Sequence, residues 1–242
     1  MLTHTKIYRA REQDHRLSEA SSFSLPDWHV PSDIASTVNN GQPALFVALA
    51  VQGRGFVSQY TLDGKVVLTW NTGYVPSGLD FDPRTDTVYV ANSSSPDVYA
   101  INANDKGGGV AHFAEVVGAG QLGPVIVDET HNQLLIGDVR NGEVYSLSLT
   151  THKSHLLAGA FRSPQALLLS PDHTKVYVAD AGGRAVYQLD LSRASNKPLV
   201  FSKAMEFKEP VGLALLSDGY IAVADDRADA VFVLTPTGAI VH

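Results

Sequence analysis

The sequence repeats a short pattern of strands and turns, and this repetition constrains the fold more than any other feature. The clearest copy lies within residues 163–192, where runs such as Lys175–Ala179 are rich in β-branched and aromatic residues. Pro171 and the pair Gly182 and Gly183 interrupt these runs. Short runs of this composition, bounded by Gly, Pro and Asp, indicate strands rather than helices. Three such strands joined by tight turns predict an antiparallel meander.

The middle strand of this meander recurs along the whole chain. Its copies are Val47–Leu49, Val90–Asn92, Ile136–Asp138, Val178–Asp180 and Val223–Asp225, the first being the weakest match. Successive copies lie 42 to 46 residues apart. A period of about 40 to 50 residues with several strands in each period is the signature of a β-propeller. A β-sandwich would not repeat its turn chemistry so regularly.

The 242 residues are expected to form a single all-β domain, a propeller of four-stranded antiparallel blades. The repeats are predicted at residues 30–73, 74–118, 119–159, 160–205 and 206–242. Residues 1–29 contain two further candidate strands and form a partial blade or an N-terminal extension. Three arrangements follow from this pattern: a six-bladed ring with one incomplete blade, a closed five-bladed ring with the N-terminal hairpin packed outside, or a piece of a longer protein.

Composition excludes several functional classes. The chain has no cysteine, which excludes disulfides, cysteine-based zinc sites and thiol catalysis. No apolar run is long enough for a transmembrane helix, so membrane insertion is not expected. The start of the chain shows no secretory signal, and a cytoplasmic protein or the mature part of an exported one both fit. The formal net charge of −7 predicts a soluble protein and disfavours nucleic acid as a partner.

Two copies of the repeat carry a family resemblance. The residues concerned are Pro164–Leu167, Val176–Asp180, Ala185–Leu189, Pro210–Leu213, Ile221–Asp225 and Ala230–Leu234. These segments are similar to the NHL repeat, so the chain resembles the NHL-repeat β-propeller family and, more distantly, gluconolactonase/regucalcin-like propellers. The resemblance covers nearly all of residues 74–242 and, more faintly, residues 30–73. It implies the six-bladed arrangement, and it implies either a protein- or RNA-binding module or an enzyme such as an amidating lyase or a lactonase.

The resemblance also implies where a lactonase-type enzyme would hold its divalent metal, namely over the central channel. The positions that match the family's ligands are Ser32, Ser77, Gly123, Gln165 and Val211. None of them supplies an anionic oxygen, although hard cations need several such ligands. Asp33 lies one residue beyond the first position and would act alone. No catalytic residue, metal site or cofactor is therefore predicted, with Asp225 and Asp226 as the remaining candidates for a cation.

Loops on one face of the predicted propeller carry a recurring set of cations and aromatic residues. The loop between the second and third strands of a blade opens on the same face as the loop that leads into each blade. These loops supply Arg54, Arg140, Arg162, Arg184 and Arg227, together with Trp28, Phe161 and Phe207 three residues before a proline. Arginine suits bidentate capture of carboxylate or phosphate. We expect this face to bind a protein, a peptide or a small anionic ligand.

Structural roles compete with this interpretation. Asn92, Asp138, Asp180 and Asp225 directly follow a strand, where such residues cap turns by accepting backbone N–H groups. The aromatic residues could wedge between neighbouring blades, and the arginines could pair with nearby acids. The function favoured by the sequence is a non-catalytic NHL-like binding scaffold. The alternative is a metal-dependent lactonase-type hydrolase, and whether the chain is an enzyme stays open, with the balance against it.

Overall fold

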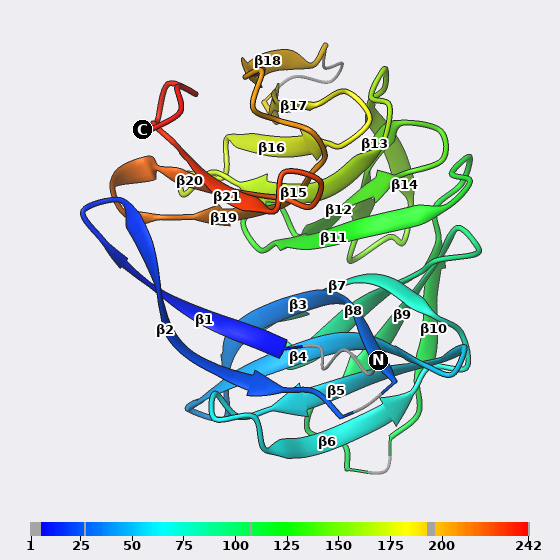
Figure 1. Cartoon of the computed structure of the whole chain (residues 1–242). Helices are drawn as coiled ribbons and strands as arrows, with labels where there is room; N and C mark the ends of the chain where they lie inside the picture. Colours follow the sequence, from blue (N-terminus) through cyan, green and yellow to red (C-terminus); the bar gives the residue numbers. More distant parts are fainter. Residues whose placement is uncertain (1–5, 27, 107, 193–196, 242) are drawn as a thin grey trace.

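Five antiparallel sheets stand side by side around a central channel in the computed structural model (Figure 1). The structure describes residues 6–26, 28–106, 108–192 and 197–241. The chain is therefore an all-β propeller, which confirms the predicted fold class. Apart from a short 3₁₀ turn at Ser217–Gly219, the described residues form strands and turns alone. No described helix could cross a membrane.

The first four blades each have four strands in sequential order. The first blade comprises β3 (His29–Asn39), β4 (Gln42–Val51), β5 (Arg54–Tyr60) and β6 (Val66–Asn71). The second comprises β7 (Pro76–Asp82), β8 (Thr87–Asn92), β9 (Asp97–Asn102) and β10 (Ala111–Glu115). The third comprises β11 (Leu122–Asp128), β12 (Gln133–Asp138), β13 (Glu143–Ser148) and β14 (Ser154–Ala158). The fourth comprises β15 (Pro164–Leu169), β16 (Lys175–Asp180), β17 (Ala185–Asp190) and β18 (Leu199–Ser202).

The fifth blade has a reduced outer edge. It contains β19 (Pro210–Leu215), β20 (Ile221–Asp225) and β21 (Ala230–Leu234). The four-stranded repeat predicts a further strand after β21, but the segment there contributes a single bridge between Leu234 and Ile240, and His242 lies outside the described residues. The Thr235 N–H donates to the Ala239 carbonyl at 2.8 Å, and the turn closed by this bond leaves little chain for a longer ladder.

A separate two-stranded sheet, β1 (Lys6–Gln13) and β2 (Arg16–Ser24), lies between the first and fifth blades (Figure 1). At one end, Ile7 and Phe23 pack against the apolar side of the first blade. At the other end, the Ser217 hydroxyl donates to Glu12 Oε1 at 2.6 Å, and the His15 ring stacks on Tyr220 with centroids 3.6 Å apart. The number of blades is therefore five, as in the five-bladed arrangement that the sequence left open, and the N-terminal hairpin forms a separate sheet.

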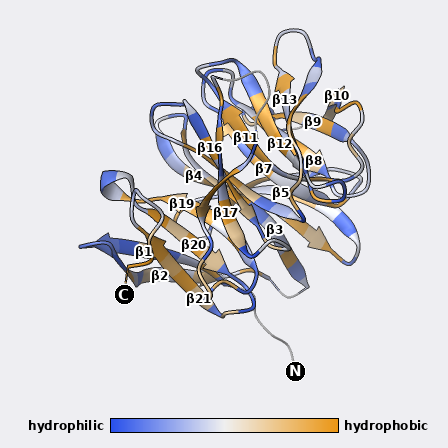
Figure 2. Ribbon diagram, turned by 90° about the horizontal axis from the view of Figure 1, so that it is seen from above, coloured by the Kyte–Doolittle hydropathy of each residue, from blue (hydrophilic) through white to orange (hydrophobic). Residues whose placement is uncertain are grey.

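The core lies between the blades, because each sheet is apolar on both faces. Phe46 of the first blade is fully buried and stacks on Phe81 of the second, with ring centroids 5.1 Å apart. The inner strands β3, β7, β11, β15 and β19 lie beside one another in that order. Glycine is required at position 78, where a Cβ atom would overlap the backbone oxygen of Gly123 on the next inner strand. In Figure 2 the hydrophobic colours fall mainly on the strands, and hydrophilic colours mark the turns and much of β1.

Candidate functional site

The inner strands enclose a channel with a cavity of about 650 Å³. The five positions that correspond to the metal ligands of lactonases all line it: Ser32, Ser77, Gly123, Gln165 and Val211. Ser32 turns its hydroxyl to the backbone of the neighbouring blade and donates to the Pro76 carbonyl at 2.7 Å. The channel wall at these positions therefore offers hydroxyl, amide and apolar groups rather than carboxylates.

Two carboxyl groups also line the channel, those of Asp33 and Asp80. Asp33 accepts the backbone N–H groups of Ile34 and Leu79 at 2.8 and 2.9 Å. Asp80 repeats this arrangement one blade further on, accepting from Phe81 and Val127 at 2.8 Å each. Each aspartate thus joins its own inner strand to the next one.

Burial in the enclosed channel changes the acidity of both groups. It raises the pKa of Asp33 to about 7, against the opposing effect of the hydrogen bonds from Leu79 and Ile34. Burial likewise raises the pKa of Asp80 to about 6, and the charge on Asp80 adds to the rise at Asp33. The sequence interpretation left Asp33 without a partner and missed Asp80, whose only signal was an acidic residue between the apolar Leu79 and Phe81 of the inner strand Pro76–Asp82.

The channel residues do not fit a divalent cation. Both oxygens of each aspartate already accept a backbone N–H group. Within the described part of the chain, no group of three His, Cys, Asp or Glu side chains is arranged to hold a metal ion. Hard cations need several oxygen ligands that are free to coordinate. We therefore assign no metal-dependent step to this channel.

Buried aspartates organise the loops on one face of the propeller. Asp180 is 1% exposed and accepts the backbone N–H groups of Arg162, Ser163 and Gly183 at 3.0, 2.7 and 3.1 Å. Asp138 and Asp225 hold the corresponding loops of the third and fifth blades in the same way. Each aspartate fixes the loop that leads into its blade to the loop between the second and third strands.

Asp225 and Asp226, the candidates for a cation, differ in their surroundings. The carboxylate of Asp225 is buried and accepts the backbone N–H groups of Lys208, Glu209 and Ala228 at 2.8 to 3.0 Å. The side chain of Asp226 is exposed, and its backbone N–H donates to the Glu209 carbonyl at 3.1 Å. The two carboxylates are therefore placed in different environments, one within the loop framework and one in solvent.

These loops bring several of the expected cations together in what we term the basic groove, formed by Arg162, Arg184 and Lys203. It is a cavity of about 650 Å³ between the fourth and fifth blades, and Tyr187 and Phe207 also line it. A second cavity of about 330 Å³ shares Arg184 and continues to Lys208 and Arg227. Lys208 follows Phe207 as Arg162 follows Phe161, whereas Lys203 was not anticipated, because no cation recurs at its position in the other loops that lead into a blade.

The cations of the basic groove have no counterion among the described residues. In the described residues, no ion pair or side-chain hydrogen bond joins Arg162, Arg184 or Lys203 to another group. Arg227, at the far end, pairs with Glu209 through Nε and Oε2 at 3.4 Å. Lys208 donates to the Met205 carbonyl at 3.2 Å. Three positive charges are therefore free to meet a ligand in a protein whose net charge is −7.

The remaining candidate residues lie elsewhere. Arg54 and Arg140 are exposed on other blades, outside the basic groove. Phe161 and Phe207 are 6% and 1% exposed and pack edge-to-face against Tyr187 and Phe232. Trp28 is 67% exposed beside the start of β3. Of the three aromatic candidates, Trp28 is thus the one with most of its surface in solvent.

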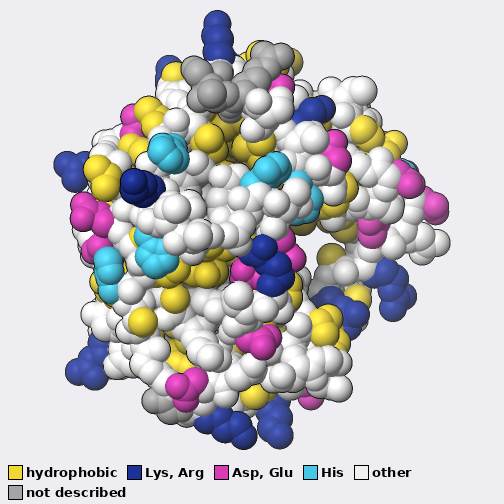
Figure 3. Space-filling view, turned by 180° about the vertical axis from the view of Figure 1, so that it is seen from behind, with side chains coloured by type: hydrophobic (Ala, Val, Ile, Leu, Met, Phe, Trp, Pro, Cys, Tyr) yellow, Lys and Arg dark blue, Asp and Glu magenta, His cyan; other side chains and the backbone are white. Residues whose placement is uncertain are grey.

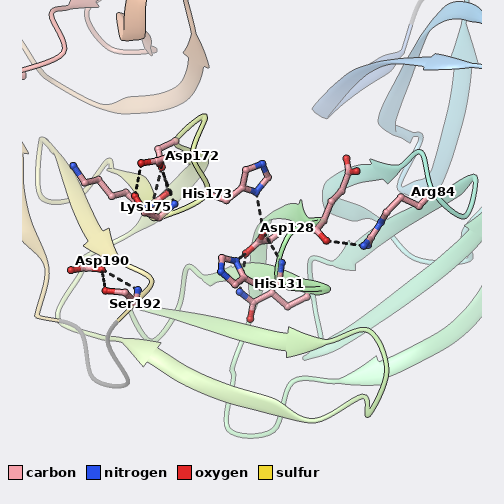
Figure 4. Close-up of polar contacts among 12 residues, drawn as sticks. Arg84, Asp128, His131, Asp172, His173, Lys175, Asp190 and Ser192 are labelled. Atoms are coloured by element: carbon pink, nitrogen blue, oxygen red, sulfur yellow. Dashed lines mark hydrogen bonds and ion pairs between the residues drawn. The ribbon is translucent and has the colours of Figure 1, made fainter.

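A polar cluster on the opposite face joins the blades at their other ends (Figure 4). The buried carboxylate of Asp128 contacts Nδ1 of His131 at 2.6 Å and Nδ1 of His173, from the fourth blade, at 3.0 Å. Arg84 of the second blade donates to the Glu129 carbonyl of the third at 2.8 Å. Burial raises the pKa of Asp128, but hydrogen bonds from Gln133, His173 and His131 outweigh it and hold this pKa below its usual value.

Asp128→Ala is expected to lower the free energy of unfolding by about 2 kcal/mol at pH 7, because its donors are partly exposed and can turn to water. Since its pKa is lowered on folding, the contribution of Asp128 is present above pH 4 and lost as the pH falls below it. Urea denaturation at pH 7 and pH 3 measures both effects. The exposed control Asp226→Ala should be neutral, and an equal loss at pH 3 would contradict the ionic role of Asp128.

The fold and these sites define a propeller of the NHL/SMP-30-like type. Residues 119–242, just over half of the chain, match the family model described as SMP-30/Gluconolactonase/LRE-like region, so the chain belongs to this family. No significant match was found among curated protein sequences. Solved structures resemble this chain in fold over most of its length, although their sequence identity to it is low.

Three solved structures illustrate this similarity. The chain matches the structure of a nidogen/laminin complex with a TM-score of 0.79 and 12% identity, over 96% of this chain and 87% of that chain. It matches a protein from Bacteroides caccae with a TM-score of 0.66 and 13% identity, over 92% and 84%. It matches luciferin-regenerating enzyme with a TM-score of 0.68 and 13% identity, over 86% and 74%. At these identities the likeness establishes the fold alone.

Proposed function

We propose that the protein is a non-catalytic propeller scaffold that binds an acidic peptide segment of a partner protein in the basic groove. The observation that carries this proposal is the set of three cations without counterions, Arg162, Arg184 and Lys203, around one cavity. Charged side chains that line a cavity without partners supply binding energy that the fold itself does not use. Loops on a rigid scaffold are also the common place for recognition residues.

The shape of the cationic surface favours an extended peptide over a single small anion. Arg184 belongs to both cavities, so positive charge continues from Arg162 and Lys203 to Lys208 and Arg227. Arginine can bind each carboxylate with two parallel hydrogen bonds. The partly exposed Tyr187 and the 91% exposed Met205 add apolar surface along the same path. Successive acidic residues of one strand could therefore meet successive cations.

The similar solved structures include a protein complex and an enzyme. The choice between binding and catalysis therefore depends on the sites of this chain. The nidogen/laminin structure supports a propeller that binds protein. Luciferin-regenerating enzyme and the family match support the alternative, a metal-dependent lactonase-type hydrolase. The channel favours binding, because its two carboxylates are engaged by backbone N–H groups. Addition of Ca²⁺, Zn²⁺ or Mn²⁺ should accordingly leave the melting temperature unchanged, whereas a specific ion would raise it.

The binding test uses a fluorescein-labelled hexaglutamate peptide and fluorescence anisotropy. Replacing Arg162, Arg184 and Lys203 together by alanine should weaken binding roughly tenfold, since three exposed ion pairs together contribute about 0.6–3 kcal/mol and tenfold is about 1.4 kcal/mol. The control replaces Arg54, Lys65 and Arg140, which removes the same charge outside the basic groove. Equal weakening in both variants, or none in the first, would contradict the proposed site.

A further inference from the structure

The last blade leaves uncovered a position that is buried in every other blade. Val57, Val98, Val144 and Val186 occupy the same place on the third strand of the first four blades, and each is 0% exposed. Their counterpart in the fifth blade, Val231, is 55% exposed. In the first four blades this valine faces the next blade around the ring, as Val186 faces Phe207, Ile221 and Val223. The fifth blade has the same apolar face, and no blade formed by the described residues lies against it.

The first blade shows the complementary feature. Leu79, Val125 and Leu167 lie on the inner strands of the middle blades and are 2%, 2% and 6% exposed. Each pairs directly with the central residue of the second strand of its own blade, and each faces the preceding blade. The residue at this position in the first blade, Ile34, is 45% exposed. Both sides of the space between the first and fifth blades therefore present apolar residues that the repeat elsewhere buries.

The β1–β2 sheet spans this space without filling it. Figure 3 shows an opening between this sheet and the rest of the molecule. A cavity of about 320 Å³ remains between the sheet and β3, lined by Ile7, Phe23, Ile34 and Leu45 with Arg9 as its only charged residue. Among the described strands, β1 pairs with β2 alone, so its other edge retains unpaired N–H and C=O groups.

We propose that the space between the first and fifth blades is a docking site for an apolar β-hairpin of a partner protein. The interface between successive blades, repeated four times from β3 to β19, would continue across the face that carries Val231. A strand pair is the occupant that fits, because an inner hairpin is what covers this face in each earlier blade. The hairpin would pack its apolar face on the fifth blade, as successive blades pack face to face elsewhere in the ring.

The surface specifies the chemistry of the hairpin. The face of the fifth blade that carries Val231 combines Ala214, Ala222, Ala224, Val231 and Val233, which are cross-strand neighbours on one side of the sheet. Ala222 is 6% exposed, and Val231 is the most accessible large apolar side chain of the set. Small side chains allow a partner strand to approach closely, and the partner should present branched apolar residues in alternation. Arg9 at the opposite side selects an acidic residue at the edge of the hairpin. The site does not overlap the basic groove, so it stands apart from the proposed function.

The probe is a head-to-tail cyclised peptide with residues 163–182 of this chain, which contains β15, its turn and β16, the inner hairpin of the fourth blade. Cyclisation is needed because an isolated hairpin is barely stable in water. The dye-labelled peptide should bind in anisotropy titrations, and a scrambled cyclic peptide should bind at least tenfold more weakly. Saturating hexaglutamate should not displace it, which separates this site from the basic groove.

Val231→Glu should weaken hairpin binding at least tenfold, while Val117→Glu, at a valine that is 71% exposed elsewhere, should leave it unchanged. Both valines are already in solvent, so both variants should keep the wild-type circular dichroism spectrum. Equal affinity for the cyclic and scrambled peptides, or for wild type and Val231→Glu, would overturn the proposal. Sedimentation that shows a dimer abolished by Val231→Glu would also overturn it, because a second copy would then cover this face.

Discussion

Asp138→Ala is expected to lower the free energy of unfolding by about 3–5 kcal/mol, the range for removing one member of a buried charge-assisted network. Asp138 is 0% exposed and accepts backbone N–H groups from Gly120, Gln121, Arg140 and Asn141 at 2.6 to 3.2 Å. These donors are fixed in two loops and cannot all turn to water when the carboxylate is removed. Urea denaturation at pH 7 measures the loss.

Two comparisons make this expectation specific. Asp138→Asn retains one acceptor oxygen at the same place and should lose about half as much stability as the alanine variant. Asp226→Ala removes an exposed carboxylate from the same face and should be neutral within about 0.5 kcal/mol. A loss below about 1 kcal/mol in Asp138→Ala would show that the loops hold their positions without this carboxylate.

The protein should lose stability as the pH rises from 5 to 8 because of Asp33 and Asp80. Their pKa values are raised on folding, to about 7 and about 6, so the folded protein keeps protons that the unfolded chain has released. As the pH rises from 5 to the folded pKa of each group, the free energy of unfolding falls by about 1.4 kcal/mol per pH unit for that group. The total loss is roughly 3 kcal/mol after allowance for water in the channel. Urea denaturation at pH 5 and pH 8 measures this difference.

The double variant Asp33→Asn/Asp80→Asn isolates the contribution of the channel. Neutral side chains cannot titrate, so the fall in unfolding free energy between pH 5 and pH 8 should shrink by roughly 3 kcal/mol relative to wild type. Asp82, Asp97, Asp128 and Asp172 have lowered pKa values, and their losses come at more acidic pH. An unchanged pH dependence in the double variant would show that the channel carboxylates ionise freely in the folded protein.

The repeat in the sequence was sufficient to predict the fold. The spacing of Val90, Ile136, Val178 and Val223 follows from the need to place one equivalent residue in each sheet, and all four lie at the centre of the second strand of a blade. The irregular parts were harder to predict. The segment after Leu234 turns back within five residues, through a bond between Thr235 and Ala239, and contributes only one bridge.

The candidate site was predicted in part. The recurrence of arginine identified Arg162, Arg184 and Arg227, which the structure places around two adjoining cavities. Lys203 was missed because its equivalent in the preceding blade is Gly159, so no recurring cation marks this position. Asp80 was missed because its position relative to Asp33 depends on the rotation between neighbouring blades. The sequence period does not specify this rotation. The exposure of Val231 was hidden for the same reason, since its sequence environment matches that of the buried valines.

The aspartates that join neighbouring inner strands occur on only one side of the ring. Asp33 links the first blade to the second and Asp80 links the second to the third. In the described residues, no carboxylate on β11 or β15 makes the equivalent link, and the fourth and fifth blades meet through apolar contacts. Modules joined by shape alone can exchange surface residues without breaking a shared polar bond. The half of the ring that carries the basic groove is thus the half most open to evolutionary change in what it recognises.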